Sequence, residues 1–504
     1  MSGVAKIVSV APVGYDASLV EVECDLKNGL PNLQIVGLGS KAIDEAKERV
    51  RSAITNSLLE FPPRKVVINL APAELPKDGS HYDLAIALAI LVGSGQLQQR
   101  EVANAVFAGE LALDGSLRPI RGTISIAEAA KKGGFSALYV PVANAKQATL
   151  VEDITVIGVP NLKQLFLHLK REQLLRPAAS EPIVASQMPS GPTLDDVHGQ
   201  LQAKRAITIA AAGHHNILLS GSPGAGKTML AQIIPSLLPP LSNEEQIAVT
   251  KLHSLAGEAI DDVLTSRPFR SPHHTASRIA LIGGGAKPKP GEISLAHLGV
   301  LFLDEIPEYP RTTLEALRQP LEDNCVSISR AGGHVTYPAN FMLVATMNPC
   351  PCGFYGDEKR ECTCSQQQIL GYQQRLSGPL LDRIDLVVNV GRVTNEELLN
   401  HASMNNSQHN EATEAIQHAY TLQSNRYKSS VLHNSNLSSR DVKSKLALSP
   451  AVRQLLTKAT EKLNVSARSY FKIIKVARTI ADLENATEIE PQHIAEAIQY
   501  RIQK

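Results

Sequence analysis

An eight-residue glycine-rich segment limits what this chain can fold into more than any other feature. It reads GSPGAGKT, which fits the pattern G-x-x-x-x-G-K-T, and lies between an apolar stretch at 216–219 and a helix-forming stretch at 229–234. A strand, a turn and a helix in this order aim backbone N–H groups at phosphates, which argues against a chance glycine-rich turn. The residues expected to bind ATP are Gly221, Ser222, Pro223, Gly224, Ala225, Gly226, Lys227 and Thr228. The lysine is expected to reach the β- and γ-phosphates, and the threonine to hold Mg²⁺.

Two further apolar stretches are expected to bring polar groups to the same place. The stretch 300–303 ends at Asp304 and Glu305, and the stretch 341–346 ends near Asn348. Ligands bind where the carboxyl ends of α/β strands meet. We therefore expect Asp304 to position Mg²⁺, Glu305 to act as general base and Asn348 to orient the lytic water. A strand that ends in solvated acids is the plainer alternative.

Arginines complete the candidate ATPase site. Arg383 lies among apolar residues and acids, where an arginine alone is more often a surface ion pair. Because it follows the asparagine strand, it looks like an arginine finger offered to the γ-phosphate of a neighbouring subunit. Arg468 is the candidate second sensor, with Arg478 of the same predicted helix as the fallback.

The chain divides into three parts and a linker. We expect two α/β domains, at 1–171 and 194–393, and the second contains the phosphate-binding segment. A proline-rich extended linker is expected between them, at 172–193. Residues 394–504 predict a helical lid in which 429–445 form a loop. The strands expected are 5–10, 19–25, 65–70, 137–140, 216–220, 300–303 and 341–345, and the helices 42–58, 81–91, 124–132, 395–424, 450–463, 467–484 and 491–502.

Composition is that of an ordinary soluble globular protein. The hydrophobic share is 43%, the charged share 20% and the net charge +1, so a nucleic-acid surface has to be a local patch. The longest apolar run, 84–92, is about half the length of a membrane crossing, and the N-terminus lacks the pattern of a signal peptide. We expect no membrane association and a cytoplasmic location, where cysteines are more often thiols or metal ligands than disulfides.

Four of the six cysteines form two closely spaced pairs, Cys350-Pro-Cys352 and Cys362-Thr-Cys364. Four thiolates can bind a structural zinc ion tetrahedrally, although the commoner spacing is C-x₂-C. The segment 350–364 is therefore expected to be a zinc-binding insert. Four reduced thiols in a polar loop are the alternative.

Several short segments are more specific than these patterns. They are GQ at 199–200, AKRA at 203–206, HN at 215–216, RPFR at 267–270, PHH at 272–274, PGEISLAH at 290–297, MNPCPCG at 347–353 and SGPLLDR at 377–383. Together with the order of the ATPase elements they resemble the magnesium-chelatase-like AAA+ proteins, specifically the ComM (YifB) family. The resemblance covers essentially the whole chain and weakens between 401 and 448.

The resemblance implies a homo-hexamer that moves DNA with ATP. Its expected activity is branch migration of recombination intermediates in natural transformation. The expected partners are single-stranded or branched DNA and recombination proteins. The alternative from the same resemblance is a chelatase motor that inserts Mg²⁺ into a porphyrin. That alternative is disfavoured because chelatase motors lack the N-terminal domain found here and the chain has no acidic metal-binding extension.

The resemblance also implies that residues 1–171 form a Lon-protease-like domain without its catalytic dyad. Pro76 to Gly79 match the start of the Lon nucleophile segment, but His81 holds the nucleophile position and Ser80 lies one place early. Ile124 holds the position of the lysine. With both members of the Ser/Lys dyad missing, we expect no protease activity.

Two segments resemble the pore-lining parts of related motors. Residues 326–337 predict a hairpin with a Gly-Gly turn, in which Arg330 would contact a DNA phosphate. Lys287 and Lys289 lie in a glycine- and proline-rich loop that resembles the helix-two insert. Ordinary solvated side chains are the alternative for each of the three.

Overall fold

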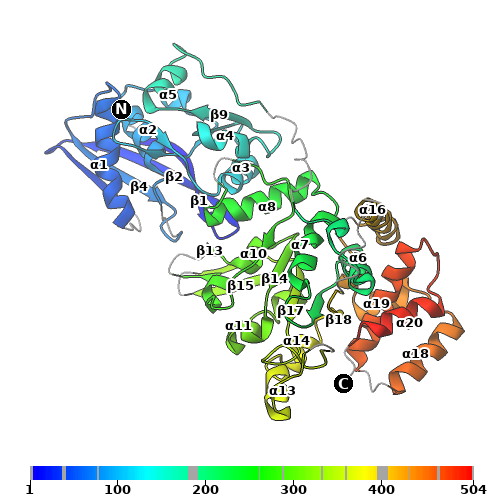
Figure 1. Cartoon of the computed structure of the whole chain (residues 1–504). Helices are drawn as coiled ribbons and strands as arrows, with labels where there is room; N and C mark the ends of the chain where they lie inside the picture. The colour runs from blue at the N-terminus through cyan, green and yellow to red at the C-terminus, as the bar shows by residue number, and fades with distance from the viewer. Residues whose placement is uncertain are drawn as a thin grey trace.

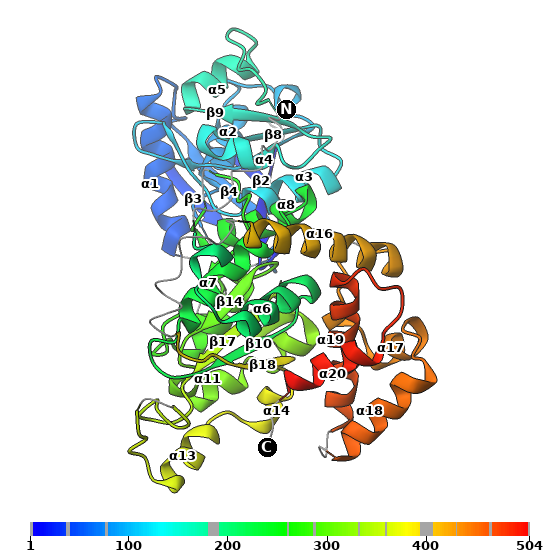
Figure 2. The same cartoon turned by 45° about the vertical axis from the view of Figure 1, so that its right-hand side comes forward.

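Three bodies follow one another in the computed structural model: an N-terminal α/β domain, a central α/β domain and a C-terminal group of helices (Figures 1 and 2). This order confirms the expected fold class. The residues that the structure describes are 4–36, 41–75, 79–179, 191–259, 262–285, 289–330, 333–357, 360–393, 407–429, 431–462 and 466–501.

The N-terminal domain is built on a seven-stranded sheet in the order β3-β4-β2-β1-β5-β8-β9. Strands β1 and β2 pair antiparallel, whereas β1, β5, β8 and β9 run parallel. Helix α2 packs on β1 and β2 with every residue from Leu84 to Leu91 fully buried, as an all-apolar helix requires. The strands are β1 (Ala5–Val13), β2 (Asp16–Lys27), β3 (Asn32–Val36), β4 (Lys65–Ala71), β5 (Ala105–Phe107), β6 (Glu110–Leu111), β7 (Leu117–Arg118), β8 (Ala137–Pro141) and β9 (Thr155–Val159), and the helices are α1 (Lys41–Asn56), α2 (Asp83–Gly93), α3 (Thr123–Lys132), α4 (Val142–Ala148) and α5 (Leu162–Leu169).

The central domain contains a five-stranded sheet in the order β11-β14-β17-β10-β18, with every pairing parallel. Its strands are β10 (Ile217–Ser220), β11 (Phe269–Arg270), β14 (Val300–Leu303), β17 (Met342–Met347) and β18 (Leu386–Asn389). The hairpins are β12–β13 (Gly283–Gly284, Lys289–Pro290) and β15–β16 (Cys325–Arg330, Gly333–Pro338). The helices are α6 (Leu201–Gly213), α7 (Lys227–Leu237), α8 (Asn243–Ala256), α9 (Arg278–Ile282), α10 (Glu292–Leu295), α11 (Arg311–Glu315), α12 (Pro320–Asp323), α13 (Gln366–Gln373) and α14 (Gly378–Leu381).

The C-terminal helices share a core with the central domain, because α16 and α19 pack against α6. The described part of the helix expected at 395–424 is in α16, and residues 394–406 lie outside the described ranges. The helices are α16 (Gln408–Tyr427), α17 (Ser439–Lys445), α18 (Pro450–Lys462), α19 (Ala467–Leu483) and α20 (Pro491–Gln499).

The prediction of a loop over 429–445 was wrong for its last part, because α17 forms at Ser439–Lys445. The helix starts at a capping box: the Ser438 hydroxyl accepts from the Asp441 N–H, and the Asp441 carboxylate accepts from the Ser438 N–H. Val442 is the only residue of α17 that is buried. The helix therefore has almost no apolar periodicity by which the sequence could reveal it.

The predicted linker begins later than expected. The Ala178 N–H donates to the Val156 carbonyl oxygen at 2.8 Å, so the residues just after α5 still attach to β9. Residues 180–190 of the predicted linker lie outside the described ranges.

Helix α8 of the central domain docks on the N-terminal domain beside α3 (Figures 1 and 2). Lys251 Nζ lies 2.5 Å from the Glu128 carboxylate and 3.9 Å from the centroid of the Tyr15 ring. The Ser254 hydroxyl accepts from the Gly122 N–H at 3.1 Å. A buried ammonium held by a carboxylate and an aromatic face ties the two domains together.

The turn between β1 and β2 makes a second contact between these domains, on the hairpin β15–β16. Gly14 has φ +63° and approaches so closely that a Cβ there would lie 2.2 Å from Cγ1 of Val335. Tyr15 packs in the same apolar cluster as Val335. The N-terminal domain therefore touches the strand of the central domain that follows the hairpin tip.

Gly14→Ala should loosen this contact, and Gly95→Ala is the matched control because Gly95 has φ +81° with nothing within 4 Å of its would-be Cβ. Both changes carry a left-handed backbone penalty of about 1–2 kcal/mol. Only Gly14→Ala adds a clash, worth about 1–3 kcal/mol. Calorimetry should give a lower Tm for Gly14→Ala than for the control, and faster hydrogen exchange in β15–β16 should be confined to it. Equal behaviour of the two variants would contradict the close approach.

Candidate nucleotide site and cysteine cluster

The glycine-rich segment forms a loop between the carboxyl end of β10 and the first residue of α7. Gly224 and Gly226 have φ of +77° and +82°, which glycine adopts at little cost. Lys227 folds back over the loop, and its Nζ donates to the carbonyl oxygens of Gly221 at 2.7 Å and Ser222 at 3.0 Å. This geometry leads the loop into a helix N-terminus, where phosphates bind.

The polar residues that the sequence assigned to ATP hydrolysis meet at the carboxyl end of the central sheet, where β14 and β17 end beside β10. The Thr346 hydroxyl on β17 donates to Asp304 at 2.5 Å and accepts from the Glu305 N–H at 2.9 Å. Glu305 has φ +49°, a conformation that costs about 1–3 kcal/mol and is typical of functional sites. Asn348 Oδ1 accepts from Lys227 Nζ at 3.2 Å. The structure thus brings the predicted lysine, carboxylates and asparagine together.

The charges at this edge suit a magnesium nucleotide. Burial lowers the pKa of Lys227, and the Asp304 and Glu305 carboxylates oppose that shift. Thr228, the second residue of α7, is exposed. Its hydroxyl and the Asp304 carboxylate offer the oxygen ligands that Mg²⁺ prefers, while Lys227 offers the positive charge for phosphate.

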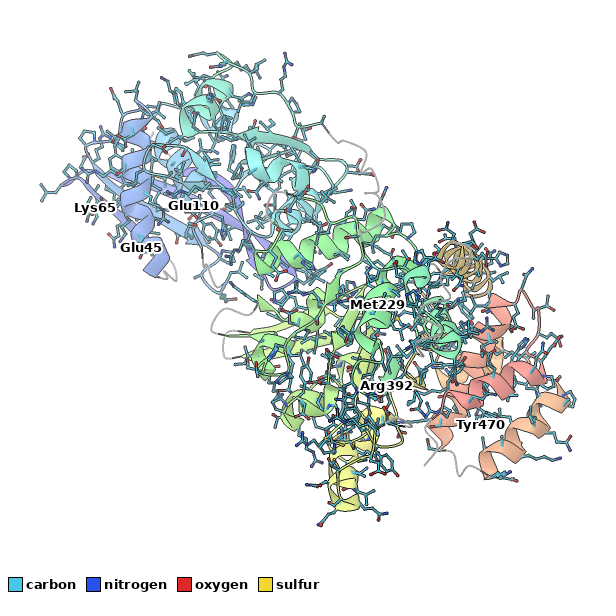
Figure 3. The ribbon with its side chains drawn as sticks, in the orientation of Figure 1. Glu45, Lys65, Glu110, Met229, Arg392 and Tyr470 are labelled. Carbon is cyan, nitrogen blue, oxygen red and sulfur yellow. The ribbon has the colours of Figure 1, made fainter. Side chains whose placement is uncertain are left out.

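A cavity of about 380 Å³ adjoins the loop. Sequence reasoning assigned a role to the loop residues that line it, but to none of the other lining side chains. Gln200 Nε2 donates to the carbonyl oxygens of Ala225 at 2.6 Å and Gly391 at 3.1 Å. The Gln200 Oε1 atom is buried with no hydrogen-bond partner among the described residues. Besides the loop, the lining residues include Asp196, Val197, His198, Gln200, Met229 and Arg392, of which Met229 and Arg392 are labelled in Figure 3.

Arg383 lies at the amino edge of the central sheet, the side at which its parallel strands begin. The phosphate loop lies at the carboxyl edge, the side at which they end. Its carbonyl oxygen accepts from Asn216 Nδ2 at 3.0 Å, and Asn216 precedes β10, whereas the loop follows it. The four residues of β10 separate the two edges by about 13 Å at ~3.3 Å per residue. The Arg383 guanidinium pairs with Glu322 and donates to the carbonyl oxygens of Pro379 at 2.6 Å and Arg318 at 3.1 Å.

Arg468 lies beside Arg383, since its Nη2 is 3.7 Å from the same Glu322 carboxylate. Both arginines line a cavity of about 470 Å³ at that edge and therefore lie away from the phosphate loop of their own chain. Arg478 is buried in the helical domain, where it donates to Asp482 at 3.1 Å. Arg478 therefore has a structural partner, and Arg468 is the better placed of the two candidates.

The hairpin β15–β16 forms as expected, with Arg330 in register with Gly333. The side chain of Arg330, and Lys287 altogether, lie outside what the structure describes. Lys289 is exposed on β13. The residues leading into β12 line one pocket with Ile328 of β15, so the two hairpins lie side by side.

The region around Ser80 differs from a Ser/Lys dyad. The Ser80 hydroxyl donates to Glu110, and Ile124 is fully buried. Burial lowers the pKa of His81 to about 4, which keeps this imidazole neutral. Residues 76–78 of the Lon-like motif lie outside the described ranges.

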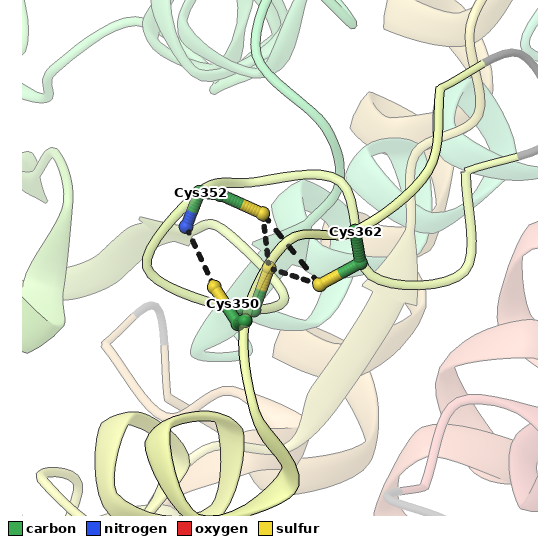
Figure 4. Close-up of side chains that lie close together, drawn as sticks. Cys350, Cys352 and Cys362 are labelled. Atoms are coloured by element: carbon green, nitrogen blue, oxygen red, sulfur yellow. Dashed lines mark hydrogen bonds between the residues drawn. The ribbon is translucent and has the colours of Figure 1, made fainter.

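The four clustered cysteines converge in space (Figure 4), all four Sγ atoms lying within 4.8 Å of one another. Cys350 Sγ is 3.3 Å from Cys352 Sγ and 3.6 Å from Cys362 Sγ. Tetrahedral zinc with Zn–S bonds of about 2.3 Å places its sulfurs about 3.8 Å apart. Backbone N–H groups donate to Sγ of Cys350 and Cys364, as they commonly do to metal-bound thiolates. The donor set fits zinc.

Among the described residues, no helix combines the length and the apolar character that a membrane span needs.

Comparison with known proteins covers all three bodies. The family model described as magnesium chelatase, subunit ChlI, matches residues 193–398, the model for subunit ChlI of Mg-chelatase matches residues 22–144, and the model for the ChlI C-terminal part matches residues 406–501. The magnesium-chelatase 67 kDa subunit of Heliobacterium mobile is 26% identical over 212 residues, which are 36% of this chain and 32% of that protein.

Two relatives match nearly end to end. The protein YifB of Salmonella typhimurium is 43% identical over 493 residues, which are 97% of this chain and 96% of YifB. The competence protein ComM of Haemophilus influenzae is 43% identical over 503 residues, which are 99% of this chain and 97% of ComM. The chain therefore belongs to the ComM (YifB) family of magnesium-chelatase-like AAA+ proteins.

Proposed function

We propose that this protein is a ring-forming ATPase, a homo-hexamer that uses ATP hydrolysis to move branch points in DNA during recombination. The observation that carries the proposal is that the ATPase residues lie at two opposite ends of the strands of the central sheet. Lys227, Glu305 and Asn348 lie at the carboxyl edge, whereas Arg383 and Arg468 lie at the amino edge. Only a neighbouring chain can bring arginines of the second edge to ATP held at the first.

Each residue then has a defined part in hydrolysis. Lys227 binds the β- and γ-phosphates. Thr228 and Asp304 would hold Mg²⁺, and the ion would supply positive charge against the phosphates. Glu305 accepts a proton from the attacking water, which Asn348 orients. The neighbour's arginine stabilises the charge that develops on the γ-phosphate.

Arg383→Ala should lower ATP turnover by about 10³-fold or more, because an arginine finger is worth ~10³–10⁵ in rate. Nucleotide affinity should stay within a few-fold, since the residue lies away from the loop of its own chain. Mixing Arg383→Ala with Lys227→Ala protein should restore part of the turnover, because mixed rings contain some intact composite sites. Full activity of Arg383→Ala alone would contradict a shared site.

The proposed DNA contacts are Arg330, Lys287 and Lys289 on the two adjacent hairpins. One chain contributes few such charges, and a ring of six multiplies them around a central pore. Affinity for DNA grows with the number of phosphates neutralised. The competence protein among the relatives supports a role in integrating DNA taken up during natural transformation. The chelatase alternative is not favoured, because the named chelatase subunit matches about a third of the chain.

ATPase rates with and without single-stranded, duplex and four-way-junction DNA test this function. We expect junction DNA to stimulate hydrolysis and ATP to drive movement of a mobile branch point. Glu305→Gln should bind ATP and the junction without moving the branch, because it keeps the Mg²⁺ site and loses the base. Wild-type protein that hydrolyses ATP but neither binds nor moves any junction would overturn the proposal.

Arg330→Ala should lower DNA affinity, flatten its salt dependence and leave basal hydrolysis intact. Lys458→Ala is the matched control, since Lys458 is an exposed cation on α18 away from both hairpins. A flattened salt dependence in the control as well would show that the effect is not specific to the hairpin.

We also infer that the four clustered cysteines hold one structural zinc ion, supported by their sulfur spacing and backbone N–H···S bonds. Elemental analysis should find about one zinc per chain, lost when Cys362 and Cys364 both become serine. Metal-free wild-type protein with unchanged stability would favour four free thiols instead.

A further inference from the structure

The cysteine cluster begins in the sequence just after a residue of the candidate nucleotide site. One residue, Pro349, separates Asn348 from Cys350. Asn348 accepts a hydrogen bond from Lys227 at 3.2 Å, and Cys350 is fully buried. The first thiol therefore lies two residues from the amide that contacts the phosphate-binding lysine.

The loop between the two cysteine pairs also packs directly on the phosphate loop. Gly353 has φ +85°, and a Cβ there would lie 2.6 Å from Cγ and Cδ of Pro223. The Gly353 N–H donates to the Cys350 carbonyl oxygen at 2.9 Å. The cysteine loop turns sharply at the point where it meets the phosphate loop.

A polar bridge joins the same two loops. The Asp357 carboxylate, 4% exposed, lies 3.1 Å from Nε of Arg392, and this Nε donates to the Ser222 hydroxyl at 3.2 Å. The Arg392 guanidinium lies 5.4 Å from the centroid of the Phe354 ring. Arg392 also lines the cavity beside the phosphate loop. The cysteine loop thus places a cation against the nucleotide site.

The loop lacks the regular backbone hydrogen bonds of a helix or sheet, so the thiols and a few side-chain contacts hold it in place. Most of its described residues are exposed or half-buried, and it forms neither helix nor strand between β17 and α13. A loop of this kind has a large conformational entropy unless something binds its ends together. A metal bound by thiols from both ends would remove most of that freedom.

We propose that the metal site and the nucleotide site are thermodynamically coupled through the loop 350–364, so that bound metal strengthens nucleotide binding. This inference rests on the zinc site proposed above and is independent of DNA binding. Metal on the four thiols fixes Gly353 against Pro223 and fixes Asp357 on Arg392. Because coupling between two sites is reciprocal, nucleotide must strengthen metal binding by the same factor.

The experiment measures zinc affinity by competition with a zinc-selective chelator, with and without saturating ADP, and ADP affinity by calorimetry on zinc-loaded and zinc-free protein. We expect ADP to tighten zinc binding by ~5-fold or more, the lower end of usual coupling factors. Zinc should tighten ADP binding by the same factor. Equal zinc affinity with and without ADP in the wild type would overturn the proposal, as would protein that neither contains nor takes up zinc.

Two variants test the route of the coupling. Asp357→Asn keeps all four thiols and should bind zinc, but its coupling factor should fall towards 1. Glu361→Gln is the matched control, because Glu361 is an exposed acid of the same loop, and its factor should equal that of the wild type. An unchanged factor in Asp357→Asn would overturn the Asp357–Arg392 route. Should Asp357→Asn fail to fold, Arg392→Lys alters the same contact from the arginine side. Its coupling factor between zinc and ADP binding should likewise fall towards 1.

Discussion

The nucleotide site depends on one constraint, the parallel register of three short strands. Val300 pairs with Met342 on one side of β17, and Val344 pairs with Ile217 on the other. Because the strands run the same way, whatever follows each of them emerges at one edge. A slip of one residue would turn every side chain to the opposite face. Thr346 secures the register at the site itself, since it bonds both to the Asp304 side chain and to the Glu305 backbone.

Sequence reasoning identified this edge because each of its parts carries a local signature. The phosphate loop has fixed glycine and lysine positions, and both acids and the asparagine follow apolar stretches too continuous for anything but buried strands. Gln200 lies in the GQ segment that contributes to the family resemblance, but no local pattern gave Gln200 or Arg392 a role beside the phosphate loop. Each is a single polar residue whose partners lie far along the chain, the Gly391 carbonyl for Gln200 and Asp357 for Arg392. Their positions follow from tertiary packing, which no local pattern encodes.

The same limit applies to the arginines and to the domain contacts. The order of motifs pointed to Arg383, yet the amino-edge location became clear only from the hydrogen bond to Asn216. The pairing of Lys251 with Glu128 joins residues 123 positions apart, and the approach of Gly14 to Val335 spans more than half the chain. In contrast, helix α2 and the long strands of the N-terminal sheet were predictable. A helix buried on all sides is apolar along its whole length, and a strand buried on one face has apolar residues at alternate positions.

Glu322 gives the amino edge a property of its own. Its carboxylate faces both Arg383 and Arg468, and two backbone carbonyl oxygens hold the Arg383 guanidinium in one orientation. The Arg383 guanidinium is therefore already oriented and already partly stripped of water within the single chain. A phosphate from a neighbouring chain would replace one anion with another instead of drawing a mobile, hydrated side chain out of solvent. In the proposed ring, Glu322 would act in the separate chain as a stand-in for that phosphate, since it already pairs with both arginines.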